Sequence, residues 1–295
     1  MTQTVSAPKV FLDYDQAALD AAYDQAVYAS NRAQLLARYA SASEIARRRL
    51  GPPRRVAYGS APIEGIDLYL TDRPDAPINV FIHGGAWRNG TAHEYAFPAE
   101  PFVRAGAHFA VVDFNWVQDC GGSLMPMADQ VRRAIAWVAK NAASFGGDAS
   151  RIYLTTHSSG AHLGGCALIT DWGQDFGLPA NVVKGAVLAC GMYELYPVSL
   201  SARSSYVKFN DEMLQTLSAI RHIDRLHTPI VVAYGSLETP EFQRQPREFV
   251  AAVQKAGKQV ELICGENYNH FEIAETYSNP YGVLGRAALA QMKLA

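Results

Sequence analysis

A serine that follows a short apolar run is the first residue of this chain that could do chemistry. The run 152–155 is followed by residues 156–160, THSSG, which come close to the pattern G-x-S-x-G. In that pattern a sharp turn from strand to helix exposes the serine hydroxyl as a nucleophile. Here Ser158 is the candidate, and Thr156 replaces the first glycine. The alternative is that the serines of this stretch only cap the next helix.

A serine hydroxyl needs a base, and the base needs an acid that orients it. With a nucleophile on such a turn, the acid and then the histidine follow later in the chain. His270 lies in the loop after the last expected strand, whereas the other histidines belong to earlier elements. Glu238 and Glu241 both follow the strand expected at 229–234. Glu241 is expected to open a helix, where the helix dipole favours a carboxylate, so Glu238 is the preferred acid.

Stabilisation of a tetrahedral intermediate requires N–H groups directed at its oxyanion. Residues 83–87, HGGAW, directly follow the apolar run 78–82. Gly84 and Gly85 allow the backbone itself to approach a substrate, and the N–H of Ser159 is the expected second donor. The alternative is a plain turn. His83 is expected to hold this loop in place rather than to carry protons.

Four stretches together resemble the kynurenine formamidase, or arylformamidase, branch of the α/β-hydrolases, near the hormone-sensitive-lipase-like esterases. They are residues 83–87, 156–162, 238–245 and 269–273. The resemblance implies an α/β-hydrolase fold with Ser158 as nucleophile, Glu238 as acid and His270 as base. The family usually has aspartate where this chain has Glu238. No metal and no organic cofactor is expected.

The elements that must position these residues alternate between strands and helices. Six apolar strands are expected at 78–82, 108–113, 152–155, 185–190, 229–234 and 259–264, and helices at 13–50, 123–143, 160–170, 241–256 and 284–293. This alternation predicts an α/β fold with a mostly parallel central sheet and helices on both faces. Two earlier extended runs predict an antiparallel entry to the sheet, at 54–58 and 66–70.

The chain is expected to form one folding unit with two additions. Residues 1–52 form an N-terminal helical extension, and residues 53–295 form the catalytic domain. An insertion at about 191–228 is irregular in pattern, and we expect it to act as a lid over the site. No low-complexity linker separates these parts.

Composition bears on whether the chain binds nucleic acid, a membrane or a metal. The 295 residues are 49% hydrophobic and carry a net charge of −2, so no nucleic acid partner is expected. No apolar run reaches the roughly 18 residues of a membrane span, and residues 1–4 do not begin a signal peptide pattern. The four cysteines show no CxxC spacing and indicate free thiols in a reducing, cytoplasmic compartment rather than a metal site; they are Cys120, Cys166, Cys190 and Cys264.

Four aromatic residues near the expected site favour a flat, aromatic small molecule as substrate: Trp87, Trp116, Tyr193 and Phe271. The sequence therefore predicts a serine hydrolase that cleaves an amide, formamide or ester bond through an acyl-enzyme. One alternative is a general carboxylesterase of the hormone-sensitive-lipase-like type. Another is a binding protein on a hydrolase scaffold that has lost its chemistry. The oligomeric state is open, with a homodimer as one arrangement.

Overall fold

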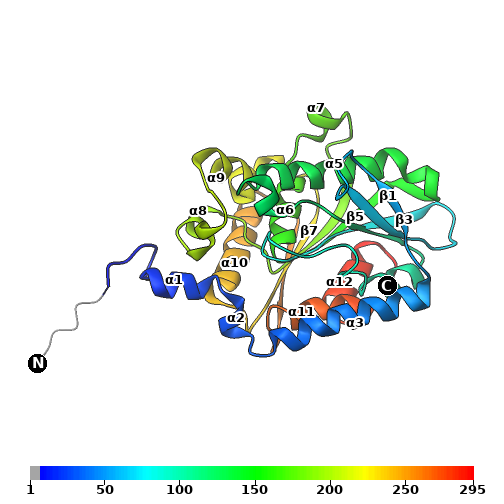
Figure 1. The fold of residues 1–295 in the computed structure, drawn as a ribbon. Coiled ribbons are helices and arrows are strands. Elements are labelled where there is room, and N and C mark those ends of the chain that lie inside the picture. The colour runs from blue at the N-terminus through cyan, green and yellow to red at the C-terminus, as the bar shows by residue number, and fades with distance from the viewer. Residues whose placement is uncertain (1–6) are drawn as a thin grey trace, which may run out of the picture.

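The computed structural model describes residues 7–295, and the expectation about residues 1–4 lies outside this range. Its centre is one eight-stranded sheet with the order β1-β2-β4-β3-β5-β6-β7-β8 (Figure 1). The strands are β1 Arg54–Ala57, β2 Gly65–Tyr69, β3 Ala76–Ile82, β4 His108–Val112, β5 Gly147–His157, β6 Val183–Ala189, β7 Ile230–Gly235 and β8 Val260–Gly265.

The sheet is antiparallel at one edge and parallel elsewhere. β1 pairs with β2, and β2 with β4, in antiparallel register, whereas the pairs from β4 onward are parallel. The predicted α/β-hydrolase fold with its antiparallel entry is therefore confirmed. Because the strands from β3 to β8 all run the same way, the loops after them meet at one edge of the sheet. Every motif singled out in the sequence follows one of these strands.

Helices cover both faces of the sheet (Figure 1). The α-helices are α1 Gln16–Ala22, α2 Gln25–Tyr28, α3 Arg32–Leu50, α4 Ala99–Arg104, α5 Met125–Asn141, α6 Ser159–Leu168, α7 Trp172–Phe176, α8 Tyr196–Ser199, α9 Asp211–Leu217, α10 Pro240–Lys255, α11 Glu272–Glu275 and α12 Val283–Gln291. Residues of α5, α6, α9 and α10 share one buried cluster with the sheet, and residues of α3, α4, α11 and α12 share another. The sheet is thus buried on both sides, as its near-continuous apolar strands require.

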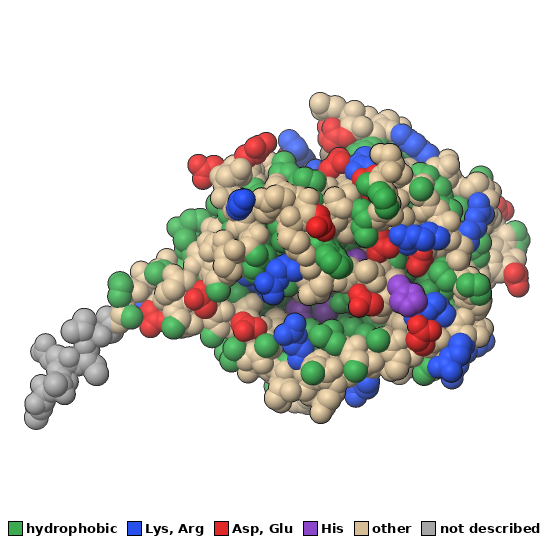
Figure 2. All heavy atoms as spheres, in the orientation of Figure 1, with side chains coloured by type: hydrophobic (Ala, Val, Ile, Leu, Met, Phe, Trp, Pro, Cys, Tyr) green, Lys and Arg blue, Asp and Glu red, His purple; other side chains and the backbone are tan. Residues whose placement is uncertain are grey.

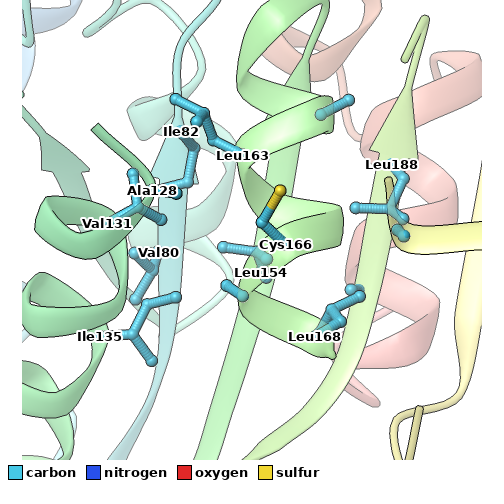
Figure 3. Packing of buried hydrophobic residues seen from close by; sticks show 14 of the residues in the cluster. Val80, Ile82, Ala128, Val131, Ile135, Leu154, Leu163, Cys166, Leu168 and Leu188 are labelled. Atoms are coloured by element: carbon cyan, nitrogen blue, oxygen red, sulfur yellow. The ribbon is translucent and has the colours of Figure 1, made fainter. Parts of the chain in front are cut away.

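Alternating side chains of β3 show how the two layers are built. Val80 and Ile82 point toward α5 and α6, where they meet Val131 and Leu163 (Figure 3). Phe81 points to the opposite face and packs edge-on against Tyr277, with ring centroids 5.7 Å apart. Neighbouring residues of this strand are thus buried on opposite faces, so the end of β3 is held firmly beneath the loop that follows it.

The N-terminal extension contains three helices instead of the single helix expected at 13–50. Asp15 caps α1, and Asp24 caps α2 by accepting a hydrogen bond from the N–H of Ala26. An aspartate side chain that satisfies free N–H groups starts a new helix, so the alanine-rich pattern is broken. α1 and α2 lie near α10 (Figure 1), whereas α3 covers the other face, where Tyr39 stacks on Phe97.

The insertion at 191–228 forms short helices. α8 and α9 lie within it, together with two 3-10 helices, η3 Ala202–Ser205 and η4 Ala219–Arg225. η3 touches the N-terminal extension, because the N–H of Ala202 donates to Asp20 Oδ1 at 2.6 Å. The insertion and the extension therefore meet on the same side of the molecule. No helix within residues 7–295 has the length and apolar character needed to cross a bilayer.

Candidate active site

Ser158 lies at the tip of a strained turn between β5 and α6. Its backbone has φ 58° and ψ −125°, a combination that non-glycine residues rarely adopt. The strand ends at His157 and the helix begins at Ser159, so the serine occupies the turn itself. Its side chain is not used as a helix cap. The geometry is that of the predicted nucleophile turn.

Close packing under the turn explains its small residues. A Cβ atom on Gly160 would lie 2.2 Å from the carbonyl oxygen of Ile82, so α6 can approach β3 only with glycine at this position. Thr156, which replaces the usual first glycine, has its methyl group over Gly164 in the next turn of α6. A Cβ on Gly164 would lie 2.7 Å from that methyl carbon. Gly164, eight residues later, thus makes room for the methyl group that Thr156 has in place of the usual glycine.

Three side chains from distant loops form one hydrogen-bonded chain. Ser158 Oγ lies 2.8 Å from His270 Nε2. His270 Nδ1 in turn makes a very short contact with Glu238 Oε1. All three side chains are buried, and they follow β5, β7 and β8. With its proton on Nδ1, the imidazole donates to Glu238 and accepts the hydroxyl proton of Ser158.

Glu241 occupies a different environment. It opens α10 as expected, and both of its carboxylate oxygens accept hydrogen bonds from Arg244 at 2.7 Å. The hydroxyl of Tyr23 donates to the same carboxylate at 2.7 Å. Of the two glutamates considered from the sequence, only Glu238 contacts His270.

Burial and nearby charges set the electrostatics of this group. Burial lowers the pKa of His270, and the positive charges of Arg203 and Arg32 lower it further. Burial raises the pKa of Glu238. The N–H of Gly235 donates to Oε2 at 3.0 Å and opposes this rise, because it favours the charged form. The imidazole is therefore neutral at pH 7, which is the form that can accept a proton.

Two histidines of the turn hold the surrounding backbone. His157 Nε2 lies 2.8 Å from the carbonyl oxygen of His270, so its ring fixes the loop of that residue. Burial lowers the pKa of His157 to about 3, which keeps this ring neutral. His162 Nδ1 accepts a hydrogen bond from Trp87 Nε1 at 3.3 Å. The turn is thereby tied to both neighbouring loops.

The loop after β3 lies directly over Ser158. Gly84 is so near that a Cβ atom there would come 3.0 Å from Ser158 Cβ. Gly85 has φ 122°, a conformation that suits glycine. Within residues 7–295, the N–H groups of Gly85 and Ser159 make no hydrogen bond, whereas the N–H of Trp87 donates to Ser159 Oγ at 3.2 Å. His83 is stacked on Phe114 beneath this loop, with ring centroids 4.4 Å apart.

A cavity of about 520 Å³ opens above the serine. Ser158, His270 and Gly85 lie in its wall, and the N-terminal extension and η3 supply much of the rest. On the face shown in Figure 2, histidine atoms are visible deep in a hollow that basic and acidic side chains surround. The site is thus open to solvent on this face.

The aromatic residues predicted for the pocket are mostly elsewhere. Phe271 lines the cavity, whereas Trp87, Trp116 and Tyr193 do not. Trp87 is 1% exposed and its indole N–H is directed at His162, and Tyr193 stacks on Phe249 with centroids 4.2 Å apart. The aromatic wall comes from residues not singled out in the sequence, namely Tyr23, Tyr39, Tyr95 and Tyr206.

Within residues 7–295, three arginines of the cavity wall have no acidic partner. Arg32, Arg88 and Arg203 line the cavity, and the ion pairs within residues 7–295 involve other arginines. Each lies over an aromatic ring, as with Arg88, whose guanidinium carbon is 4.3 Å from the centroid of Tyr206. Arg203 Nε is buried without a hydrogen-bond partner within the same residues.

One group of potential metal ligands coincides with the serine site. His157, Cys190 and His270 offer ligand atoms within 4.8 Å of one another. Both nitrogens of His270 already face Ser158 and Glu238, and burial raises the pKa of the Cys190 thiol. A thiolate is the form that binds metal, so these residues fit the hydrogen-bonded chain better than a metal ion.

Comparisons with known proteins agree with this architecture. A family model described as BD-FAE matches residues 66–177. Kynurenine formamidase of Danio rerio is 33% identical over 227 residues, which are 75% of this chain and 75% of the relative. Isoprenylcysteine alpha-carbonyl methylesterase of Arabidopsis thaliana is 26% identical over 244 residues, 75% of this chain and 56% of that protein.

Solved structures show the same fold. A protein from a Silicibacter species superposes with a TM-score of 0.80 at 21% identity, covering 92% of this chain and 98% of its own. An esterase of Pyrobaculum calidifontis gives a TM-score of 0.71 at 18% identity, with 92% and 96% coverage. The protein is an α/β-hydrolase and an enzyme that hydrolyses amide or ester bonds. Within that class, the chain belongs to the kynurenine formamidase family.

Sequence reasoning missed several residues at the site. Gln25, Arg203 and Arg32 reach it from the extension and the insertion, far along the chain from the motifs. The echo of Tyr-Asp-Gln at residues 14–16 and 23–25 was visible in the sequence. No spacing rule, however, connects such a stretch with a loop more than 200 residues later.

Proposed function

We propose that the protein is a serine hydrolase that acts through an acyl-enzyme, with Ser158 as nucleophile, His270 as base and Glu238 as acid. The observation that carries this proposal is the continuous chain from Ser158 Oγ to His270 Nε2 and from His270 Nδ1 to Glu238 Oε1. A buried acid that orients a neutral imidazole, which in turn contacts a serine on a strained turn beside the cavity, is an arrangement that activates hydroxyl groups.

The reaction follows from this geometry. Ser158 Oγ attacks the substrate carbonyl carbon while His270 Nε2 takes the hydroxyl proton. The N–H groups of Gly85 and Ser159, with Gly84 beside them, stabilise the oxyanion. The carbon–nitrogen or carbon–oxygen bond then breaks, and His270 returns the proton to the leaving group. A water molecule gives a proton to His270 and attacks the acyl-enzyme. The bond between the acyl carbon and Ser158 Oγ then breaks, His270 returns the proton to Oγ, and the acid is released.

The substrate we propose is an aryl formamide that carries a carboxylate, of which N-formylkynurenine is the example. Three features support it: the formamidase relative, the aromatic wall of the cavity, and three arginines that have no acidic partner within residues 7–295, namely Arg32, Arg88 and Arg203. Planar guanidinium groups bind carboxylates with two parallel hydrogen bonds. Arg203 Nε is a buried donor that such a group could satisfy.

A general carboxylesterase is the second candidate. The methylesterase relative and the esterase fold neighbours favour it, and the cavity is large enough for substrates other than formamides. The test is the initial rate on N-formylkynurenine, phenyl acetate and p-nitrophenyl butyrate, with Ser158→Ala as control. We expect N-formylkynurenine to have the highest kcat/KM. A preference for the butyrate ester would favour the carboxylesterase instead.

A further inference from the structure

A side chain of the N-terminal extension reaches the buried carboxylate of Glu238. The amide nitrogen of Gln25, in α2, lies 3.3 Å from Glu238 Oε1, 213 residues away in sequence. This is the same oxygen that contacts His270 Nδ1, and the second oxygen accepts the N–H of Gly235. Gln25 therefore acts on the oxygen that orients the imidazole.

The segment that carries Gln25 is anchored independently of it. The hydroxyl of Tyr23 donates to Glu241 and accepts from Gln245, both at 2.7 Å. Arg203 Nη2 donates to the carbonyl oxygen of Tyr23 at 2.9 Å. Two of these contacts are with α10 and one is with the insertion. All three hold Tyr23, which precedes Gln25 by two residues. The side-chain amide of Gln25 is consequently held in place by the contacts of Tyr23, and not only by its own hydrogen bond to Glu238.

A second observation concerns the other end of the same amide. Gln25 is 7% exposed, and its Oε1 has no hydrogen-bond partner within residues 7–295. Reversing the amide would place that oxygen against the carboxylate, where two acceptors repel. A buried unpaired acceptor costs free energy that an apolar side chain would avoid. Space filling alone is therefore a poor explanation for glutamine at this position.

We propose that Gln25 is a positioning residue for Glu238, and that residues 23–25 are a functional part of the active site. The proposal rests on the function proposed above, with Glu238 as the acid. Glutamate has one more rotatable bond than the aspartate usual in this family, so it needs more contacts to hold one rotamer. Gly235 restrains one carboxylate oxygen, and Gln25 restrains the other.

The test is a double-mutant cycle on the full-length enzyme, with kcat and KM measured on phenyl acetate. Gln25→Met removes the donor and keeps a similar volume. In the wild-type background we expect kcat to fall about tenfold or more, the usual effect of losing a hydrogen bond to a charged group, with little change in KM. In the Glu238→Ala background the same change should have almost no effect.

A matched control comes from α1 of the N-terminal extension, outside residues 23–25. Gln16 Nε2 donates to the carbonyl oxygen of Leu200 at 2.8 Å on the surface and does not line the cavity. Gln16→Ala should leave kcat at the wild-type level. If Gln25→Met fails to fold, Gln25→Leu also removes the donor and replaces it with an apolar side chain of similar size. It should lower kcat by a similar factor.

The outcomes separate this inference from the proposed function. Wild-type kcat in Gln25→Met or Gln25→Leu would overturn the inference, as would an equal loss in both backgrounds, because a merely structural role does not depend on Glu238. If Glu238→Ala itself keeps wild-type activity, the assignment of the acid fails, and the inference fails with it. A large loss in Glu238→Ala with no effect of Gln25→Met rejects the inference alone.

Discussion

The methyl carbon of Thr156 lies 2.7 Å from the position that a Cβ atom on Gly164 would occupy. This relationship explains how the turn at Ser158 tolerates threonine where the common pattern has glycine. The bulk that Thr156 adds on β5 is removed again from α6, so the helix still approaches the strand. Ser158, with its strained backbone, lies between this strand and this helix.

Gly164→Ala should therefore destabilise the protein. Overpacking of a filled core costs about 1–3 kcal/mol, and we expect a loss of this size in the free energy of unfolding measured with urea. The double variant Thr156→Ser with Gly164→Ala removes the methyl carbon of Thr156, keeps the hydrogen bond from the hydroxyl at this position to the carbonyl oxygen of Val187, and should recover most of the loss. Additive losses in the double variant would contradict the compensation.

Replacement of the two glutamates should have unequal effects on catalysis. Glu238→Ala removes the partner of His270 and should lower kcat by about 10³–10⁴-fold, as loss of the acid does in related sites. Glu241→Ala leaves that contact intact and removes the anchor of Tyr23 and Arg244, so it should mainly lower the unfolding temperature. Steady-state kinetics and thermal unfolding of both variants distinguish these roles. Equal losses of kcat would reject the assignment.

The dependence of activity on pH should show the environment of His270. Its pKa is lowered from 6.5 by burial and by Arg203 and Arg32, with Glu238 and His157 as the other titratable groups beside the ring. The base works only when unprotonated, so kcat/KM on phenyl acetate should persist to a pH below 6.5 before it falls. Arg203→Met removes a positive charge and should move this acid limb to higher pH. An unchanged limb in that variant would show that Arg203 does not act on His270.

The arginines of the cavity wall should discriminate between charged and neutral substrates. Arg203→Met should raise KM for N-formylkynurenine by about tenfold or more, because a buried charge-assisted contact is lost. Phenyl acetate has no carboxylate, and its KM should change much less. Arg49 pairs with Glu100 and does not line the cavity, so Arg49→Met is a control for the loss of one positive charge. Equal changes for both substrates would remove the support for an anionic substrate.

The fold could be predicted from the sequence, and so could the proximity of the three hydrogen-bonded side chains, because each motif directly follows a strand. In a parallel sheet, strand ends converge, so residues 158, 238 and 270 could be expected to meet. Other features depend on tertiary packing that no spacing reveals. Asp24 interrupts the expected N-terminal helix, and Gln25 therefore reaches Glu238. Tyr193 stacks on Phe249 in the core and does not reach the cavity. The cavity wall therefore comes largely from the extension and the insertion.

The most direct test of the central claim is the site at which a fluorophosphonate probe reacts. The account predicts one adduct on the wild-type enzyme, located on Ser158 by peptide mass spectrometry, with loss of hydrolysis in step with labelling. Ser158→Ala should neither label nor hydrolyse, and His270→Ala should label much more slowly. An adduct on another residue, or hydrolysis of N-formylkynurenine and phenyl acetate by Ser158→Ala at the wild-type rate, would contradict the account.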